Sequence, residues 1–473
     1  MASSIPKLFL TFYCRPHSGG DLMETIKTKK VMSPFKILAL GFASVIFTGA
    51  VLLSLPVATV SGESTHFLDA LFTSTSAVCV TGLVVVDTGT YWSFFGQLVI
   101  LFLIEIGGLG FMAMSTIFAI ILGKKISLRE RLVMQEAYNT FGLQGVIRHV
   151  RYMLLFTLSV QGTAALLLMT QFIPLYGTGK GIYYGIFHAI SAFNNAGFDL
   201  LGNYTSLTML NDNVLLLLTL AVVINIGGLG YLVWREILSG LREKKKLKNF
   251  TLHAKVVLVI SLVLLLVGTS SMLVFEWNNP MTMKDMSFGQ KLTNAFFSAT
   301  TPRTAGFNSI SNQDMSPAGK LLTMGYMFIG GSPGSTAGGV KTTTLGIVLF
   351  TLISVLKGRE DTEIYGRRLS HSTVYRAVAV FLLGIAIIIL GVMVLSISEI
   401  GQPFEMILYE VMSAFGTVGL SQGLTPSLSA IGKITIGLIM YLGRVGPLTV
   451  MLALAGKQDK ANIKYPEGKL LIG

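Results

Sequence analysis

The chain has 473 residues, of which 52% are hydrophobic and 12% are charged, and its formal net charge is +13. Soluble globular chains carry about twice this charged fraction, so the composition excludes an ordinary soluble domain and favours an integral membrane protein. Cys14 and Cys79 are far apart and the six histidines are scattered. The sequence therefore predicts neither a disulfide framework nor a metal cluster.

Residues 1–30 are predicted to form a cytoplasmic tail. Their apolar stretch is short and interrupted, and no small-residue cleavage site follows it, so a signal peptide is not expected. Met23 offers a second start position.

Eight apolar segments follow, each long enough to cross a hydrocarbon core of ~30 Å as a helix. They lie at roughly 35–55, 94–122, 152–173, 214–234, 255–275, 321–356, 376–398 and 434–455. Between the two members of each pair lies a shorter amphipathic segment, at 67–83, 186–198, 292–307 and 408–420. These four segments are too short to span the membrane and are predicted to be re-entrant helices.

The four short segments align on a final glycine, at Gly82, Gly197, Gly306 and Gly419. This regular spacing, at intervals of 115, 109 and 113 residues, predicts a fourfold repeat of span, re-entrant loop and span. The expected fold is an all-α polytopic membrane protein with eight transmembrane helices in a pseudo-fourfold arrangement around one pore. The predicted boundaries are 31–123, 124–234, 235–356 and 357–455 for the repeats, and 456–473 for a cytoplasmic C-terminal tail.

Most Lys and Arg residues lie in the tails and in the loops 123–151, 235–255 and 357–376. The positive-inside rule then places both termini in the cytoplasm, so the re-entrant loops enter from outside. The basic run REKKKLK (242–248) lies beside a span, so contact with the membrane surface or a partner is favoured over nucleic-acid binding.

The re-entrant helices direct their C-terminal ends, which carry partial negative charge, towards the membrane centre. Glycine permits backbone angles that turn carbonyl oxygens inwards, and a ring of carbonyls replaces the water shell of a cation. The predicted selectivity-filter residues are Val80, Thr81, Gly82, Asn195, Ala196, Gly197, Thr304, Ala305, Gly306, Thr417, Val418 and Gly419. No acidic residue occupies these turns, which favours a monovalent alkali cation over Ca²⁺. Tight turns in a packed bundle are the alternative.

Each second span also carries a glycine motif, IGGLG (106–110), IGGLG (226–230), IGGSP (329–333) or LGRVG (442–446), where a bend or close packing is expected. In the third repeat this motif extends into GGSPGSTAGGVKTTT (330–344). Irregular backbone at membrane depth is tolerated only where it is buried or lines water, so this loop is a candidate gate. Its predicted residues are Gly330, Gly331, Ser332, Pro333, Gly334, Ser335, Thr336, Ala337, Gly338, Gly339 and Lys341, together with Arg444.

An intramembrane arginine is costly and usually functional. Our hypothesis is that Arg444 contacts the loop and repels cations when the loop is closed. The alternative is structural, with glycines for close helix crossing and Arg444 paired with a carboxylate. Asp69, His188 and Glu410 are expected to brace the re-entrant helices by hydrogen bonds, and Arg303 to tie the third turn to its surroundings.

From about residue 30 to 473 the chain resembles the Trk/Ktr/HKT superfamily of potassium transporters. The resemblance rests on TSTSAVCVTGL, FHAISAFNNAGF, TTPRTAGFN, SAFGTVGL, the two IGGLG motifs and GRVGPLT. The short ends are most similar to the bacterial Ktr-type membrane subunit (KtrB/KtrD-like). Glu105 departs from the pattern, where a neutral residue is expected; its carboxylate would raise the local cation concentration or pair with a basic residue.

The resemblance implies potassium uptake across a bacterial plasma membrane through a gated pore. It also implies a homodimer, with the C-terminal segment NIKYPEGKLLIG as a contact. A cytoplasmic ring of RCK-type nucleotide-binding subunits (KtrA/KtrC-like), which bind ATP and ADP, is the implied regulatory partner. Plant relatives with serine at the first filter glycine pass sodium, so Gly82 favours potassium.

Two other functions stay open from the sequence. One is a sodium or non-selective monovalent cation pore of the same fold. The other is an ion-coupled secondary transporter, which is disfavoured because the four repeats are parallel rather than inverted. No cofactor is expected in this chain, K⁺ is the expected transported ion, and activation by Na⁺ is left open. An enzyme is not expected, because the sequence shows neither a nucleophile motif nor a metal cluster.

Overall fold

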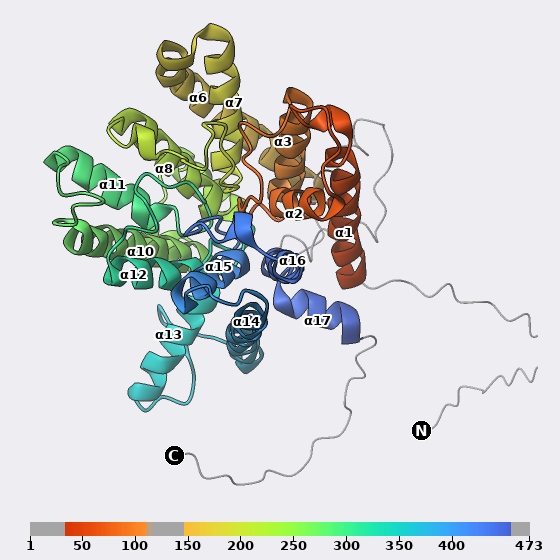
Figure 1. The fold of residues 1–473 in the computed structure, drawn as a ribbon. Coiled ribbons are helices and arrows are strands. Elements are labelled where there is room, and N and C mark those ends of the chain that lie inside the picture. Colours follow the sequence, from red (N-terminus) through yellow and green to blue (C-terminus); the bar gives the residue numbers. More distant parts are fainter. Residues whose placement is uncertain (1–33, 111–113, 115–145, 456–473) are drawn as a thin grey trace, which may run out of the picture.

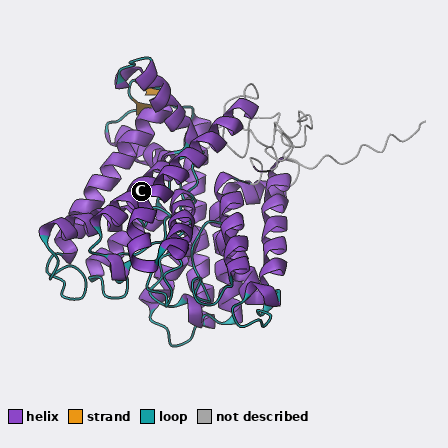
Figure 2. Ribbon diagram, turned by 90° about the horizontal axis from the view of Figure 1, so that it is seen from above, coloured by secondary structure: helices purple, strands orange, loops and turns teal. Residues whose placement is uncertain are grey.

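The computed structural model describes residues 34–110, 114 and 146–455, whose regular secondary structure is almost entirely helical (Figures 1 and 2). The predicted tails at 1–30 and 456–473 lie outside the described residues. The helical content confirms the predicted all-α class.

Four long apolar helices correspond to the predicted first spans and are long and apolar enough to cross a bilayer. They are α1 (Pro34–Leu53), α6 (Val146–Tyr176), α10 (Leu252–Glu276) and α14 (His371–Ser398). On α10, Leu262 and Leu266 are 56% and 62% exposed. Side chains of this kind, exposed along apolar helices, are expected where the helix faces lipid rather than water.

Four short helices follow the long ones and end at the predicted glycine turns. They are α2 (Phe67–Val78), α7 (Thr178–Phe193), α11 (Phe288–Thr300) and α15 (Phe404–Gly416). With 12 to 16 residues, they are about 18–24 Å long and too short for the membrane core. Helix α7 begins eight residues earlier than predicted, because Gly177 turns the chain and lets the polar TGKG stretch form its first turn.

The predicted second spans are not continuous helices, which corrects the sequence-based expectation. The chain forms α3 (Phe94–Leu109), α8 (Val214–Leu229), α12 (Pro317–Phe328) and α16 (Ala430–Val445), and each ends at its glycine motif. Three of them stop because Gly110, Gly230 and Gly446 have φ near +90°, outside the helical region. Of the predicted span 94–122, the structure describes residues 94–110 and residue 114.

The chain continues past these breaks in new directions. Helix α9 (Tyr231–Arg242) is bent by 101° from α8, and α17 (Pro447–Ala455) by 94° from α16. In the third repeat the break is a loop of twelve residues, 330–341, before α13 (Thr342–Leu356). The bend predicted at the glycine motif is confirmed at Gly230 and Gly446.

A small antiparallel hairpin, β1 (Glu363–Ile364) and β2 (Arg367–Arg368), precedes α14 and departs from the all-α expectation. Its two-residue turn, Tyr365 and Gly366, has positive φ at both positions, as a tight hairpin requires. Within the described residues, four single-turn 3₁₀ helices lie in connecting segments, at Pro56–Ala58, Thr208–Leu210, Leu247–Asn249 and Thr425–Ser427.

The helices pack in a closed circle (Figure 1). Helix α3 contacts α7, α8 contacts α11, α12 contacts α15, and α16 returns to α2. Each of these pairs joins the second span of one predicted repeat to the short helix of the next. The first and last quarters of the chain are therefore neighbours.

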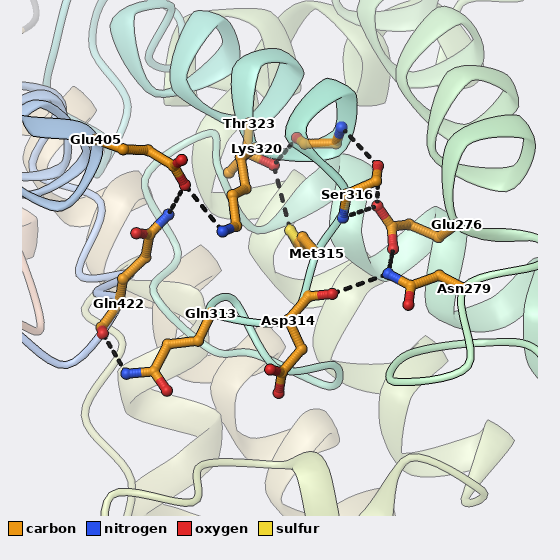
Figure 3. A network of polar contacts seen from close by, with 11 residues as sticks. Glu276, Asn279, Gln313, Asp314, Met315, Ser316, Lys320, Thr323, Glu405 and Gln422 are labelled. Carbon is orange, nitrogen blue, oxygen red and sulfur yellow. Dashed lines mark hydrogen bonds and ion pairs between the residues drawn. The ribbon is translucent and has the colours of Figure 1, made fainter. Parts of the chain in front are cut away.

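Polar contacts join neighbouring repeats at the first turn of three of the second-span helices, α3, α12 and α16. Lys433 on α16 forms an ion pair of 2.6 Å with Asp69 on α2. Lys320, at the same place in α12, forms an ion pair of 2.9 Å with Glu405 on α15 (Figure 3). At the same position in α3, Gln97 accepts a hydrogen bond from Tyr183 of α7 at 3.1 Å.

Two buried glutamates hold the starts of α12 and α16. Glu276, at the end of α10, accepts hydrogen bonds from the amide and the hydroxyl of Ser316, at 2.9 and 2.7 Å (Figure 3). Glu399, after α14, accepts from the amide and the hydroxyl of Ser429, at 3.1 and 2.6 Å. A carboxylate at a helix N-terminus satisfies free amides and interacts favourably with the helix dipole.

Candidate functional site

The four predicted filter segments form four turns of similar backbone conformation, here called the glycine turns (residues 80–82, 195–197, 304–306 and 417–419). The residue two before each glycine adopts a left-handed conformation, with φ of 55°, 58°, 73° and 50° at Val80, Asn195, Thr304 and Thr417. The glycines have φ of 91°, 72°, 78° and 92°. Left-handed backbone at non-glycine residues costs about 1–2 kcal/mol each. Four such residues at one register are typical of a functional constraint.

Each glycine turn is fixed to the end of its own short helix. The amide of the residue before each glycine donates at 2.8 Å to a carbonyl in the last turn of the helix or at its C-cap. These pairs are Thr81 to Ser76, Ala196 to Ser191, Ala305 to Thr301 and Val418 to Ser413.

The carbonyl oxygens of these same four residues face the glycines of neighbouring turns. A Cβ at Gly82 would meet the oxygen of Ala196, one at Gly197 that of Ala305, one at Gly306 that of Val418, and one at Gly419 that of Thr81. These contacts form a closed ring, because the fourth turn contacts the first. The glycines are therefore required twice, for their positive φ and for the close approach of the next carbonyl.

All four glycines also line one cavity of about 310 Å³. Asp87 and Asp199 line it as well. Asp87 accepts hydrogen bonds from the amides of Thr90 and Tyr204, both at 2.8 Å. Burial and the nearby Asp87 raise the pKa of Asp199 to about 7. Neither carboxylate was predicted as a site residue, although Asp199 stands only two positions after Gly197.

Hydroxyl groups that the sequence interpretation missed support the glycine turns from behind. Ser76 and Ser413 accept hydrogen bonds from the amides of Gly82 and Gly419, at 3.0 and 3.1 Å. In the other two turns, Ser191 donates to the carbonyl of Phe198 and Thr301 to that of Phe307. The signal in the sequence was a Ser or Thr five or six residues before each glycine.

The predicted gate residues other than Arg444 lie in the 330–341 loop, which crosses beneath the glycine turns. Its two ends are joined by hydrogen bonds from the amide of Gly330 to Val340 and from that of Thr342 to Gly331, at 2.9 and 3.0 Å. Residues 342–344 were predicted as part of the loop, but they form the first turn of α13. The extended backbone ends at Lys341, which is the N-cap of that helix. A Cβ at Gly338 would contact Thr417 of the fourth glycine turn.

The broken end of α8 supports the loop. The amides of Ser332 and Thr336 donate to the carbonyls of Gly228 and Gly227, at 2.9 and 3.3 Å. In return, Tyr231, the first residue after the break, donates its amide to Gly334 at 3.0 Å. The loop thus satisfies carbonyls at the end of α8 that have no partner within that helix.

Arg444, in the last turn of α16, contacts the loop as the hypothesis expected. Its guanidinium donates to the carbonyl of Thr336 and to those of Gly107 and Gly108 at the end of α3. These hydrogen-bonding partners are carbonyls, so the alternative pairing with a carboxylate is not observed among the described residues. Lys341 donates to Ala337 within the loop at 2.5 Å.

Glu105 on α3 forms no ion pair with a basic residue among the described residues; its effect on the local cation concentration stays a prediction. Its carboxylate accepts hydrogen bonds from the side-chain amide nitrogens of Asn194 and Gln161, at 2.7 and 2.9 Å. Asn194 immediately precedes the second glycine turn, so Glu105 supports that turn through a neutral group.

The other singled-out residues brace the short helices, as expected. His188 contacts the carbonyl of Tyr184 at 2.7 Å, and Glu410 accepts a hydrogen bond from Ser421 at 2.7 Å. Arg303 donates to Ser261 of α10 at 3.2 Å, which ties the third turn to the long helix beside it.

Comparison with known proteins places the chain in a family. Residues 18–464 match the family described as TrkH, cation transport protein. The potassium/sodium uptake protein NtpJ of Enterococcus hirae is 47% identical over 452 residues, covering 94% of this chain and 99% of that protein. The Ktr system potassium uptake protein B of Bacillus subtilis is 42% identical over 441 residues, covering 93% and 97%.

The fold matches a solved structure as well. The potassium transporter TrkH from Vibrio parahaemolyticus aligns with a TM-score of 0.70 and 18% sequence identity, over 90% of this chain and 86% of that one. These relatives are named as transport or uptake proteins rather than as enzymes. The protein is a membrane protein of the TrkH family of cation transport proteins.

Proposed function

We propose that the protein takes up potassium ions across the bacterial plasma membrane through a gated selective pore. It acts as the translocating membrane subunit of a Ktr-type system. The observation that carries this proposal is the closed ring of four glycine turns, in which each glycine lies against a carbonyl of the next turn. Relatives covering more than nine-tenths of this chain are named as potassium uptake proteins, which supports the same function.

The proposed architecture has eight membrane crossings in four parallel repeats around one pore, with the predicted repeat boundaries. The circle of helix contacts supports it, because each repeat packs against the next and the fourth against the first. In this arrangement both termini are cytoplasmic, and the cavity with Asp87 and Asp199 opens to the outside.

In the proposed mechanism a K⁺ ion enters this cavity, where two carboxylates raise the local cation concentration. It then exchanges water for the carbonyl oxygens of Thr81, Ala196, Ala305 and Val418. Neutral oxygens held by short helices select a monovalent cation, since the C-terminal ends of those helices add only partial negative charge.

The 330–341 loop is the proposed gate. It lies below the glycine turns, where Arg444 holds it through the carbonyl of Thr336, and Lys341 donates to Ala337 within the loop. Positive charge directly below the filter opposes cation passage while the loop is seated. Opening requires Arg444 to release Thr336.

A homodimer and a cytoplasmic ring of RCK-type subunits that bind ATP and ADP complete the proposed system. The name of the Bacillus subtilis relative, a Ktr system protein, supports a membrane subunit that works with others. Na⁺ is proposed as an activator rather than as the transported ion.

Sodium transport is the second candidate, because the Enterococcus hirae relative carries both cations in its name. Flux into liposomes that contain the purified protein separates the two functions when K⁺, Rb⁺, Na⁺ and Li⁺ are compared. We expect K⁺ and Rb⁺ to pass and Na⁺ and Li⁺ to be largely excluded. Equal passage of Na⁺, or flux only with an obligatory co-ion, would contradict the proposal.

A further inference from the structure

Thr336, in the middle of the 330–341 loop, touches the second glycine turn. Its hydroxyl donates to the carbonyl of Phe193 at 3.1 Å and lies 3.3 Å from the side-chain amide of Asn195. Both side chains are fully buried, at 0% and 1% exposure. A loop residue and a filter residue 141 positions apart thus share a buried polar contact.

The contact completes the hydrogen bonding of two groups. Phe193 is the last residue of α7, and carbonyls at a helix end lack partners within the helix. With its amide nitrogen towards the loop, Asn195 donates to the Thr336 hydroxyl at 3.3 Å and to Phe193 at 3.2 Å. The Thr336 hydroxyl still donates its own proton to the carbonyl of Phe193. Removing this hydroxyl would take one hydrogen-bond partner from each of these two buried groups.

The contact requires a residue without a side chain at position 227 of α8, which is Gly227. A Cβ there would meet the Phe193 carbonyl, the Asn195 side chain and the Thr336 hydroxyl. At the corresponding glycines of α3 and α16, Gly107 and Gly443, the three atoms nearest to a Cβ belong to the end of the short helix or to the glycine turn, and none belongs to the 330–341 loop. The second repeat therefore accommodates a loop side chain at this point.

The main chain of Thr336 is anchored as well. Its carbonyl accepts from Arg444, and its amide donates to Gly227 at 3.3 Å. A loop movement that releases Arg444 displaces this residue, so it also breaks the contact with Asn195. The position of the loop and the conformation of the second glycine turn therefore change together.

We propose that Thr336 is a positioning residue that couples the 330–341 loop to the cation-binding turn at Asn195. This inference rests on the proposed function, since it takes the loop as the gate and the glycine turns as the filter. In the seated position Thr336 holds Asn195 in its left-handed conformation, and with it the Ala196 carbonyl. By linkage, a K⁺ ion in the filter and a seated loop stabilise each other by the same free energy.

The test compares Thr336→Val, which removes the hydroxyl at constant shape, with Thr336→Ser, which keeps it. K⁺ binding is measured in detergent as the concentration that gives half of the K⁺-dependent thermal stabilisation, and K⁺ flux is measured in liposomes. We expect Thr336→Val to raise both the half-stabilising concentration and the flux about fivefold, as for one net hydrogen bond. Thr336→Ser is expected to stay close to wild type.

Thr163→Val is the matched control. It makes the same chemical change on α6, where the exposed hydroxyl bonds the Ser159 carbonyl of its own helix. We expect wild-type K⁺ binding and flux from it.

A second variant keeps the proposal falsifiable if Thr336→Val does not fold. Asn195→Thr places at this turn the residue found at Thr304 and Thr417, and it removes the partner of Thr336. If the contact transmits the coupling, Thr336→Val adds nothing to K⁺ affinity in the Asn195→Thr background, and Asn195→Thr alone weakens K⁺ binding.

Three results would overturn the inference or its basis, and they are distinguishable. Increased flux with unchanged K⁺ affinity means that Thr336 only tethers the loop. Unchanged flux and affinity mean that the contact carries no coupling. A wild-type protein that neither carries nor binds K⁺ overturns the proposed function itself.

Discussion

Arg444 shows how a single charged residue is accommodated beneath the glycine turns. Placing an arginine at the centre of a membrane helix costs about 2.5–3.5 kcal/mol. A hydrogen bond from a charged donor contributes about 1.5–3 kcal/mol, and Arg444 makes three, to Thr336, Gly107 and Gly108. The contacts with Gly107 and Gly108 already offset this cost, and the contact with Thr336 is added only while the loop is seated, so the arginine favours the seated loop.

Arg444→Ala is therefore expected to raise K⁺ flux. Loss of about 1.4 kcal/mol of closed-state stabilisation shifts the equilibrium of the loop tenfold, so we expect flux to increase about tenfold. Flux into liposomes measures it, with Arg235→Ala on the exposed side of α9 as the control. Unchanged or lower flux in a well-folded Arg444→Ala protein would show that the loop is not held closed by this residue.

Asp199 is expected to act through its charge rather than through direct ligation. Asp199→Asn removes one of two carboxylates from the cavity above the glycine turns, so fewer cations are concentrated there. At pH 8, above its raised pKa, we expect the half-saturating K⁺ concentration to rise about threefold at low salt and the difference to shrink as salt is added.

Rb⁺ uptake at several ionic strengths measures the effect of Asp199→Asn. The control is Asp212→Asn, an exposed aspartate outside the residues that line the cavity. If both variants behave like wild type at low salt, the cavity does not concentrate cations through Asp199.

At the scale of elements, the circle of helices closes where α16 meets α2. The ion pair between Lys433 and Asp69 joins the last predicted repeat to the first, and neither side chain is more than about a quarter exposed. Its counterpart between Lys320 and Glu405 joins the third and fourth repeats (Figure 3). Similar pairs at the same helix position indicate that neighbouring repeats are held together in the same way.

Lys433→Met is expected to lower the thermal midpoint of the purified protein, because Asp69 then loses its partner. For a pair of about 1 kcal/mol the shift is about 1–2 °C in a chain of this size. The charge-swapped protein, Lys433→Asp with Asp69→Lys, is expected to recover part of the loss. A swap that is less stable than both single variants would show that the charges do not stabilise this junction.

Parts of the fold were predictable from the sequence because they depend on local patterns. The four long helices follow from apolar length, and the four short helices from the recurring glycines at Gly82, Gly197, Gly306 and Gly419. The breaks at Gly230 and Gly446 were predicted only as bends, because a positive φ at glycine is a choice that the sequence permits but does not impose.

The contacts that define the site were less accessible to sequence analysis. Asp199 could not be found from the repeat, because the other three repeats have no acidic residue two positions after the glycine. The contact between Thr336 and Asn195 joins residues 141 positions apart and depends on the space left at Gly227. Three-dimensional closeness of this kind leaves no periodic signal, whereas the repeat itself does.

At the scale of the whole molecule, the central claim is that four turns act as one ring. The four glycines line one cavity, and each approaches the carbonyl of the next turn. A serine at any of them would strain the positive φ and displace a neighbouring carbonyl. The effect should therefore be similar in kind at all four positions, although the four local sequences differ.

The most direct test is the ratio of Na⁺ to K⁺ flux in liposomes for the series Gly82→Ser, Gly197→Ser, Gly306→Ser and Gly419→Ser. Each variant that folds, as judged by gel filtration in detergent, is expected to raise this ratio above that of the wild type about tenfold, a change of about 1.4 kcal/mol. A wild-type protein that excludes Na⁺, with the ratio raised at every position, would support a single ring of carbonyls. If well-folded variants keep the wild-type ratio, the glycine turns do not select the cation.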